Sequence, residues 1–193
     1  MKYLAFDVES GGVEAEHSLL SAYFVVIDED LKTVYGELEL LVKPDDGNYV
    51  LTAQALEVNK IDIIAHDKVA ITESKAGTML YNFLKEHAPN GTTKLTPLGQ
   101  GIFFDIQFVK RHLLNKTFNQ FVSYRVLDIS SVIQFFKLIG LVSRDLAGSL
   151  SEIATHFGIS TITNVPHTAK GDTWMSIEVL RKLKALATVE TAL

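Results

Sequence analysis

Five residues that lie far apart in the chain have side chains suited to hydrolysis assisted by metal ions. They are four acidic residues and one histidine: Asp7, Glu9, Asp105, His167 and Asp172. Carboxylates that a fold brings together repel one another, and divalent cations stabilise such a pocket. Bound cations would in turn attract phosphate groups. This set of residues therefore predicts metal-assisted cleavage of phosphodiester bonds.

Each of these short patterns could also have a purely structural role, without catalysis. Asp7 and Glu9 are two apart on a predicted strand and share one face, but both could lie at its solvent end. Asp105, at the start of a predicted helix, could simply interact favourably with the helix dipole. His167 and Asp172 could cap the helix that follows them. Only the combination of the three patterns favours a catalytic site.

The composition is typical of one globular domain, which we expect to span residues 1–193. The chain is 47% hydrophobic and 21% charged, which allows a substantial core. There is no cysteine, so disulfides, thiolate catalysis and cysteine zinc sites are excluded. The net charge of −5 argues against tight binding of duplex nucleic acid. It does not exclude an enzyme that holds a strand end, because metal ions would neutralise the carboxylates locally.

The apolar stretches are short. The longest, residues 19–27, falls well below the ~20 residues that a membrane-spanning helix needs. The N-terminal apolar run is interrupted by Asp7, which is not typical of a secretory signal. We therefore expect a cytoplasmic protein that does not contact a membrane.

The predicted elements begin with three strands in a meander. Residues 2–9, 19–28 and 33–43 are rich in apolar and aromatic residues, and the short link 28–32 predicts an antiparallel hairpin. Alternation along the first strand places its apolar side chains on the face opposite Asp7 and Glu9. The first strand would therefore present two carboxylates from one face.

Helices and short strands follow the meander. Apolar spacing predicts helices over residues 76–87, 103–114, 129–139, 149–157 and 170–187, and strands over residues 94–98 and 123–128. Residues 149–152 have the form of a capping box. Strands first, followed by alternating helices and strands, predict one α/β domain with a mixed sheet.

The order of the motifs resembles that of a known family. Asp7-Val-Glu9 in the first strand, Phe104-Asp105 at a mid-chain helix start and His167-x4-Asp172 opening the last helix resemble the DnaQ-like exonucleases of the DEDDh type. That family has a ribonuclease H-like fold, in which an antiparallel N-terminal meander joins a mixed sheet with flanking helices. The resemblance runs from Phe6 to about Leu183, and segments 51–61 and 126–128 also agree with it.

The chain departs from the family pattern at two places. Ser10-Gly11-Gly12 stands where the family usually has Thr-Gly or Thr-Thr-Gly, and Gly101 stands where it often has Asn. Neither departure removes a metal ligand. Both bear on how the terminal nucleotide is held.

The resemblance implies a role for each of the five residues. Asp7 would bridge two divalent ions, Mg²⁺ or Mn²⁺, which hard oxygen ligands suit. Glu9 and Asp172 would complete the site that holds the attacking water, and Asp105 would serve the second ion, partly through water. His167 would be the general base, because an imidazole can accept a proton near neutral pH.

The resemblance also implies substrate contacts next to the first strand. The backbone from Ser10 through Gly11 and Gly12 to Val13 would lie against the terminal sugar. Val13 and Leu56 would pack against the last bases, and an apolar wedge of this kind gives little sequence preference. Ordinary core packing remains the alternative for both apolar residues.

The activity implied is 3′–5′ exonucleolytic release of nucleoside 5′-monophosphates from single-stranded or frayed DNA, in proofreading or repair, with a polymerase or another replication protein as a potential partner. Three alternatives stay open. One is an exoribonuclease of the same family, since DNA and RNA differ by 2′-hydroxyl contacts that the sequence does not place. The others are a non-catalytic domain that binds nucleic-acid ends and an endonuclease of the ribonuclease H type.

Overall fold

The computed structural model describes residues 1–89, 93–146, 148–160 and 165–190. Its centre is a six-stranded mixed sheet whose strands lie in the order β4 (Ile71–Thr72), β3 (Val34–Lys43), β2 (Leu19–Asp28), β1 (Lys2–Ser10), β5 (Thr96–Gly99) and β6 (Leu127–Asp128). The first three strands pair antiparallel, whereas β5 pairs parallel with β1, β6 with β5 and β4 with β3. The predicted α/β class and the antiparallel start of the sheet are confirmed.

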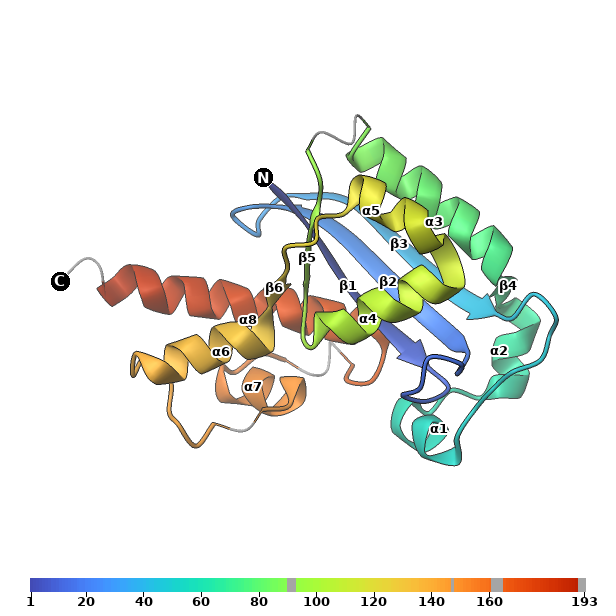
Figure 1. Ribbon diagram of the computed structural model, residues 1–193. Coiled ribbons are helices and arrows are strands. Elements are labelled where there is room, and N and C mark those ends of the chain that lie inside the picture. Colours follow the sequence, from blue (N-terminus) through green and yellow to red (C-terminus); the bar gives the residue numbers. More distant parts are fainter. Residues whose placement is uncertain (90–92, 147, 161–164, 191–193) are drawn as a thin grey trace.

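Helices cover both faces of this sheet (Figure 1). One face carries α3 (Glu73–His87), α4 (Ile102–Val109) and α5 (Phe118–Phe121), and the other carries α6 (Ile129–Leu138), α7 (Leu150–His156) and α8 (Ala169–Glu190). Leu4, Phe6 and Val8 of β1 are buried under the first layer, and Ala5 is buried under the second. Side chains of β1 therefore alternate between the two cores, as the sequence predicts.

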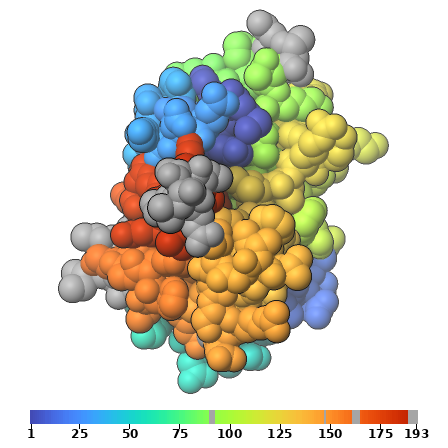
Figure 2. Space-filling model, turned by 90° about the vertical axis from the view of Figure 1, so that its left-hand side faces the viewer, coloured from blue at the N-terminus to red at the C-terminus, as the bar shows by residue number. Residues whose placement is uncertain are grey.

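The second layer is formed by the C-terminal part of the chain. Figure 2 shows the segment that holds α6 and α7, in orange, beside the red surface of α8. Ile133, Ile153 and Met175, one from each of these helices, are buried in the same apolar cluster. This layer holds α8 against the face of β1 from which Asp7 and Glu9 project.

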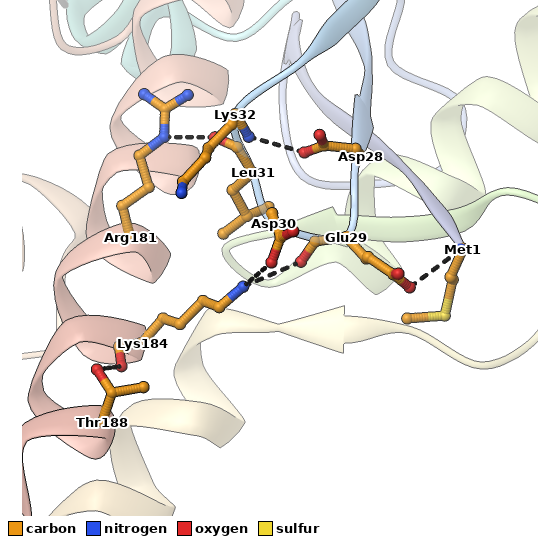
Figure 3. A network of polar contacts seen from close by, with 9 residues as sticks. All are labelled: Met1, Asp28, Glu29, Asp30, Leu31, Lys32, Arg181, Lys184 and Thr188. Carbon is orange, nitrogen blue, oxygen red and sulfur yellow. Dashed lines mark hydrogen bonds and ion pairs between the residues drawn. The ribbon is translucent and has the colours of Figure 1, made fainter. Parts of the chain in front are cut away.

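A polar network fixes α8 to the turn between β2 and β3 (Figure 3). Arg181 Nε donates to the carbonyl oxygen of Leu31 at 2.7 Å, and Lys184 Nζ donates to Asp30 Oδ1 at 2.6 Å. Exposed ion pairs contribute little to stability by themselves, but these contacts join two elements far apart in the sequence. Asp172 lies in the first turn of the same helix, so they help to set its position.

Several predicted elements differ in extent. Three short α-helices were not predicted, α1 (Ala53–Asn59), α2 (Ile63–Val69) and α5 (Phe118–Phe121). The predicted helix 103–114 continues beyond Val109 as a π-helical turn, Lys110–Leu114, whose Leu113 carbonyl packs against α3 where Gly77 has no side chain. The predicted strand 123–128 is reduced to β6, because Ser123 Oγ accepts the amide of Arg125 in a turn. In the part of the chain that is described, the helices lack the combination of length and apolar composition that crossing a membrane requires.

Candidate active site

Three carboxylates converge where β1 meets the start of α8. Asp7 and Glu9 leave the same face of β1, and α8 covers that face. Asp172 faces them from the first turn of α8. One oxygen from each side chain lies within 4.8 Å of the other two. The structure therefore brings together three of the four acidic residues that the sequence singled out.

Asp105 approaches β1 from the opposite helical layer. It lies in the first turn of α4 and is 4% exposed, and its Oδ1 accepts the backbone amide of Val8 at 3.1 Å. This amide is available because β5 pairs with β1 only as far as Ala5. Asp105 is not one of the three residues whose carboxylate oxygens lie within 4.8 Å of one another, but its negative charge acts on Asp7.

Burial disfavours the ionised form of all four carboxyl groups, and repulsion by neighbouring carboxylates adds to this effect for Asp7, Glu9 and Asp105. Burial, together with the charge of Asp172, raises the pKa of Glu9 to about 7. Burial raises the pKa of Asp172 to about 6, although His167 opposes the shift. The pKa of Asp7 is raised well above its usual value by burial and then by Asp105, Asp172 and Glu9. Burial also raises the pKa of Asp105, against the stabilising hydrogen bond from Val8.

The chemistry and spacing of the carboxylates suit divalent cations. The available donors are carboxylate oxygens, which suit the hard ions Mg²⁺ and Mn²⁺. Oxygens within 4.8 Å of one another can share a cation. The repulsion that raises the pKa of Asp7 is the interaction that a bound cation would reverse. The residues therefore fit the metal ions that the sequence predicts.

His167 lies in the loop that leads into α8. Its backbone has a left-handed conformation with φ of 59°, and its amide donates to Asp172 Oδ2 at 3.3 Å. The side chain is exposed and borders a cavity of about 190 Å³ that Glu9 and Lys170 also line. The histidine and a carboxylate of the group of three thus face one cavity.

A tight loop holds His167 in this place. Thr168 Oγ1 donates to the carbonyl of Val165 at 2.7 Å and accepts the amide of Gly171 at 3.0 Å. A Cβ added to Gly171 would lie 1.9 Å from the Val165 carbonyl oxygen. Gly171 is therefore needed for the loop between His167 and Asp172 to close, which the spacing of the motif did not reveal.

A second cavity, of about 400 Å³, also borders Glu9. Ser10 at the end of β1 and Gly12 and Val13 in the loop that follows line it; these are three of the residues expected from the sequence to contact substrate. Further lining residues were not predicted, namely His17, Thr52, Gln54, Ala55, Val58, Asn59 and Phe104. Leu56 does not line it, because on α1 the residues that face the cavity are Gln54, Ala55, Val58 and Asn59. An i, i+3, i+4 pattern in residues 54–59 could have indicated this face.

The two glycines after Ser10 allow close packing of this loop. The amide of Gly11 donates to Ser18 O at 2.8 Å, and the Gly11 carbonyl accepts the amide of Thr52 at 2.7 Å. A Cβ on Gly11 would lie 2.4 Å from the carbonyl oxygen of Val50, and one on Gly12 would lie 2.7 Å from the ring of His17. Gly11 is buried and fixes the loop to the start of α1, whereas Gly12 borders the cavity.

No protein-family profile and no curated protein matches this chain, but solved structures do. The zinc-bound complex of E. coli ExoI with single-stranded DNA superposes with a TM-score of 0.78 at 16% identity, covering 95% of this chain and 40% of that one. E. coli exonuclease I with a dT13 oligonucleotide gives a TM-score of 0.77 at 14% identity, with 99% and 42% covered.

These matches establish the architecture. The chain has a ribonuclease H-like fold, as predicted. A complex described as ExoI with SSB-Ct also matches, with a TM-score of 0.74 at 14% identity over 97% of this chain. This chain spans about two fifths of the length of the exonuclease I chains, between 40% and 43% in those compared.

Proposed function

We propose that this chain forms one metal-dependent 3′–5′ exonuclease domain of the DnaQ-like DEDDh type. Its substrate is single-stranded or frayed DNA, and its products are nucleoside 5′-monophosphates. The observation that carries the proposal is the convergence of Asp7, Glu9 and Asp172 within 4.8 Å on a ribonuclease H-like fold. Asp105 beside β1 and His167 beside Glu9 complete the set.

The positions of the side chains support distinct roles. The charges of Asp105, Asp172 and Glu9 all act on Asp7, and Asp105 and Asp172 come from two different helices, which supports a bridging role for Asp7 between two cations. When bound, two Mg²⁺ or Mn²⁺ ions would activate the attacking water and stabilise the leaving 3′ oxygen. His167 would accept the proton of that water, because its side chain borders the same cavity as Glu9.

The cavity of about 400 Å³ would hold the terminal nucleotide. Val13, Val58 and Phe104 are 76%, 46% and 38% exposed and give it apolar walls. Apolar and aromatic surfaces accept any base, which supports low sequence preference. We assign the contacts to the last bases to these three residues rather than to Leu56, which does not line the cavity.

DNA is the preferred substrate in this proposal. Structures of E. coli exonuclease I with dT13 and dA16 oligonucleotides resemble this chain, which supports binding of single-stranded DNA. An exoribonuclease would need the same carboxylates, so only a direct comparison of sugars separates the two. The match to the complex of ExoI with SSB-Ct supports a protein partner. The proposal also places the domain in DNA repair or replication in the cytoplasm.

The test is degradation of 5′-labelled single-stranded DNA and RNA of the same sequence in Mn²⁺. We expect a ladder that shortens from the 3′ end, faster on DNA, and absent with Asp7→Asn. A substrate with a blocked 3′ end should be resistant, whereas an endonuclease would cleave it. Intact DNA and RNA after incubation with the metal-loaded wild type would contradict the proposal and favour a domain that only binds nucleic-acid ends.

A further inference from the structure

The outer side of α4 carries an aromatic and basic cavity that is separate from the carboxylates. Its volume is about 430 Å³, and its lining includes Phe103, Lys110, Phe118, Tyr124 and Lys94. Phe103 is 58% exposed and Tyr124 is 83% exposed. Large aromatic side chains on a monomer surface often mark binding sites, and none of the proposed catalytic residues lines this cavity.

Positive charge accompanies the aromatic side chains. Lys94 and Lys110 line the cavity, no acidic residue lines it, and the Arg125 guanidinium lies 5.2 Å from the ring centre of Tyr124. Within the described ranges, neither lysine nor Arg125 forms an ion pair. Lys94 Nζ donates to the carbonyl of Asn119 at 2.6 Å and keeps further donor capacity. In a chain of net charge −5, such a cavity attracts an anionic ligand.

One helix connects this cavity to the candidate active site. Phe104 borders the 400 Å³ cavity beside Glu9, and its neighbour Phe103 borders the outer cavity of 430 Å³. Asp105 follows both, buried against β1. A strand whose 3′ end lies beside Glu9 can therefore cross the start of α4 and reach the aromatic and basic cavity.

We propose that this outer cavity binds the single strand a few nucleotides on the 5′ side of the scissile bond. Phe103 and Tyr124 would stack on bases, and Lys110 and Lys94 would contact phosphates. Aromatic faces combined with unpaired cations suit single-stranded nucleic acid, and continuity with the active site favours it over an acidic peptide. The proposal rests on the proposed function, since it assumes a strand end in the active site.

The length of the helix predicts how much of the strand is bound. Phe103 and Lys110 are seven residues apart, which corresponds to roughly 10 Å along a helix. Stacked nucleotides are about 3.4 Å apart along one strand, so the surface spans about three nucleotides. A substrate shorter than this should not use the outer cavity.

The test compares a long substrate with a minimal one. Two variants are compared with the wild type. One carries both Lys110→Gln and Tyr124→Ala, and the other carries Phe103→Ala. Each is assayed on dT13 and on the p-nitrophenyl ester of thymidine 5′-monophosphate. Binding of fluorescein-labelled dT13 in EDTA is followed by anisotropy. Lys85→Gln and Phe135→Ala are matched controls, because both residues are exposed and line neither the two cavities next to Glu9 nor the outer cavity.

We expect Kd and KM for dT13 to rise about tenfold in the double variant, in line with the loss of one stacked base. The slope of log Kd against log salt should fall by about 0.7 for the phosphate contact of Lys110. Hydrolysis of the ester should equal that of the wild type. Unchanged binding of dT13 would overturn the proposal, as would an equal loss on the ester. The proposal would also be overturned if the wild type bound a poly-aspartate peptide and the double variant lost that binding while still binding dT13 as the wild type does. This result would assign the cavity to a protein partner.

The two proposals can fail separately. If the wild type hydrolyses neither dT13 nor the ester, the proposed exonuclease activity is wrong. Anisotropy in EDTA measures the affinity of the protein for dT13, and therefore the contribution of the outer cavity, independently of cleavage. Loss of dT13 affinity in the double variant, with the controls unchanged, would then still assign the cavity to single-stranded DNA.

Discussion

The backbone amide of Val8 donates to Oδ1 of Asp105 at 3.1 Å, and this bond joins β1 to the first turn of α4. Val8 stands between Asp7 and Glu9, so the contact fixes the strand at the point where both carboxylates project. Asp105 is therefore a structural acceptor as well as a proposed metal ligand. The two roles can be separated, because an amide side chain can accept the bond without carrying the charge.

Replacing Asp105 with asparagine or alanine should separate these roles. Asp105→Asn can keep the bond to Val8, so we expect little change in the free energy of unfolding at neutral pH. Asp105→Ala leaves a buried amide without a partner, which costs about 1–3 kcal/mol. Both variants should lose at least about 100-fold in exonuclease rate, because each lacks a ligand for the metal ions. Urea unfolding and a single-turnover assay measure the two effects, and equal stability of the two variants would contradict the structural role.

The stability of the metal-free protein should fall as pH rises. The pKa of Glu9 is raised to about 7 in the fold, so the folded protein holds a proton that the unfolded chain releases from about pH 4.5 upward. The contribution of Glu9 to the free energy of unfolding is therefore fully present below about pH 4.5 and is lost as the pH rises through 7. Asp172, with a pKa of about 6, contributes in the same direction. Thermal unfolding in EDTA between pH 5 and pH 8 measures the effect.

Glu9→Gln is the control for this pH dependence. The glutamine does not titrate, so the variant should match the wild type near pH 5 and exceed its stability at pH 8 by on the order of 2 kcal/mol. Millimolar Mg²⁺ should reverse the order at pH 8, because the wild type binds the ion more tightly. Wild-type stability that rises relative to the variant between pH 5 and pH 8 in EDTA would show that burial and the charge of Asp172 do not raise the pKa of Glu9.

Gly101 should tolerate asparagine better than alanine. It precedes α4 with φ of 64° and ψ of 30°, a left-handed conformation, and a Cβ there would meet nothing within 4 Å. The cost of substitution is therefore one of backbone strain, about 1–2 kcal/mol for alanine and less for asparagine. Thermal unfolding of Gly101→Ala and Gly101→Asn tests this order. A larger loss for asparagine would contradict it. The preference also explains why asparagine can stand at this place in the family that the sequence resembles.

The sequence predicted the parts of the site that follow from local rules. Alternation along a strand placed Asp7 and Glu9 on one face, and a position in the first helical turn predicted where Asp172 lies. Val58 and Phe104 were not predicted as cavity residues, because their exposure depends on how α1 and α4 pack around the loop after β1. The π-helical turn after Val109 was also missed, since it depends on packing against Gly77 of α3.

Replacing His167 should remove proton transfer without removing the metal ions. His167→Asn preserves tolerance for the left-handed backbone at φ of 59° and keeps the amide that donates to Asp172. Its side chain cannot accept the proton, so the rate should fall by about 100-fold to 10,000-fold. The rise in melting temperature with Mg²⁺ should remain, because the carboxylates are unchanged.

His156→Asn is the matched control for this variant, because His156 is exposed on α7 and borders neither cavity next to Glu9. It should cleave dT13 at the wild-type rate. A His167→Asn enzyme as fast as this control would exclude the imidazole as the general base. If the rate and the stabilisation by Mg²⁺ were both reduced in His167→Asn, His167 would instead act on the carboxylates, by holding Asp172 in the position where cations bind.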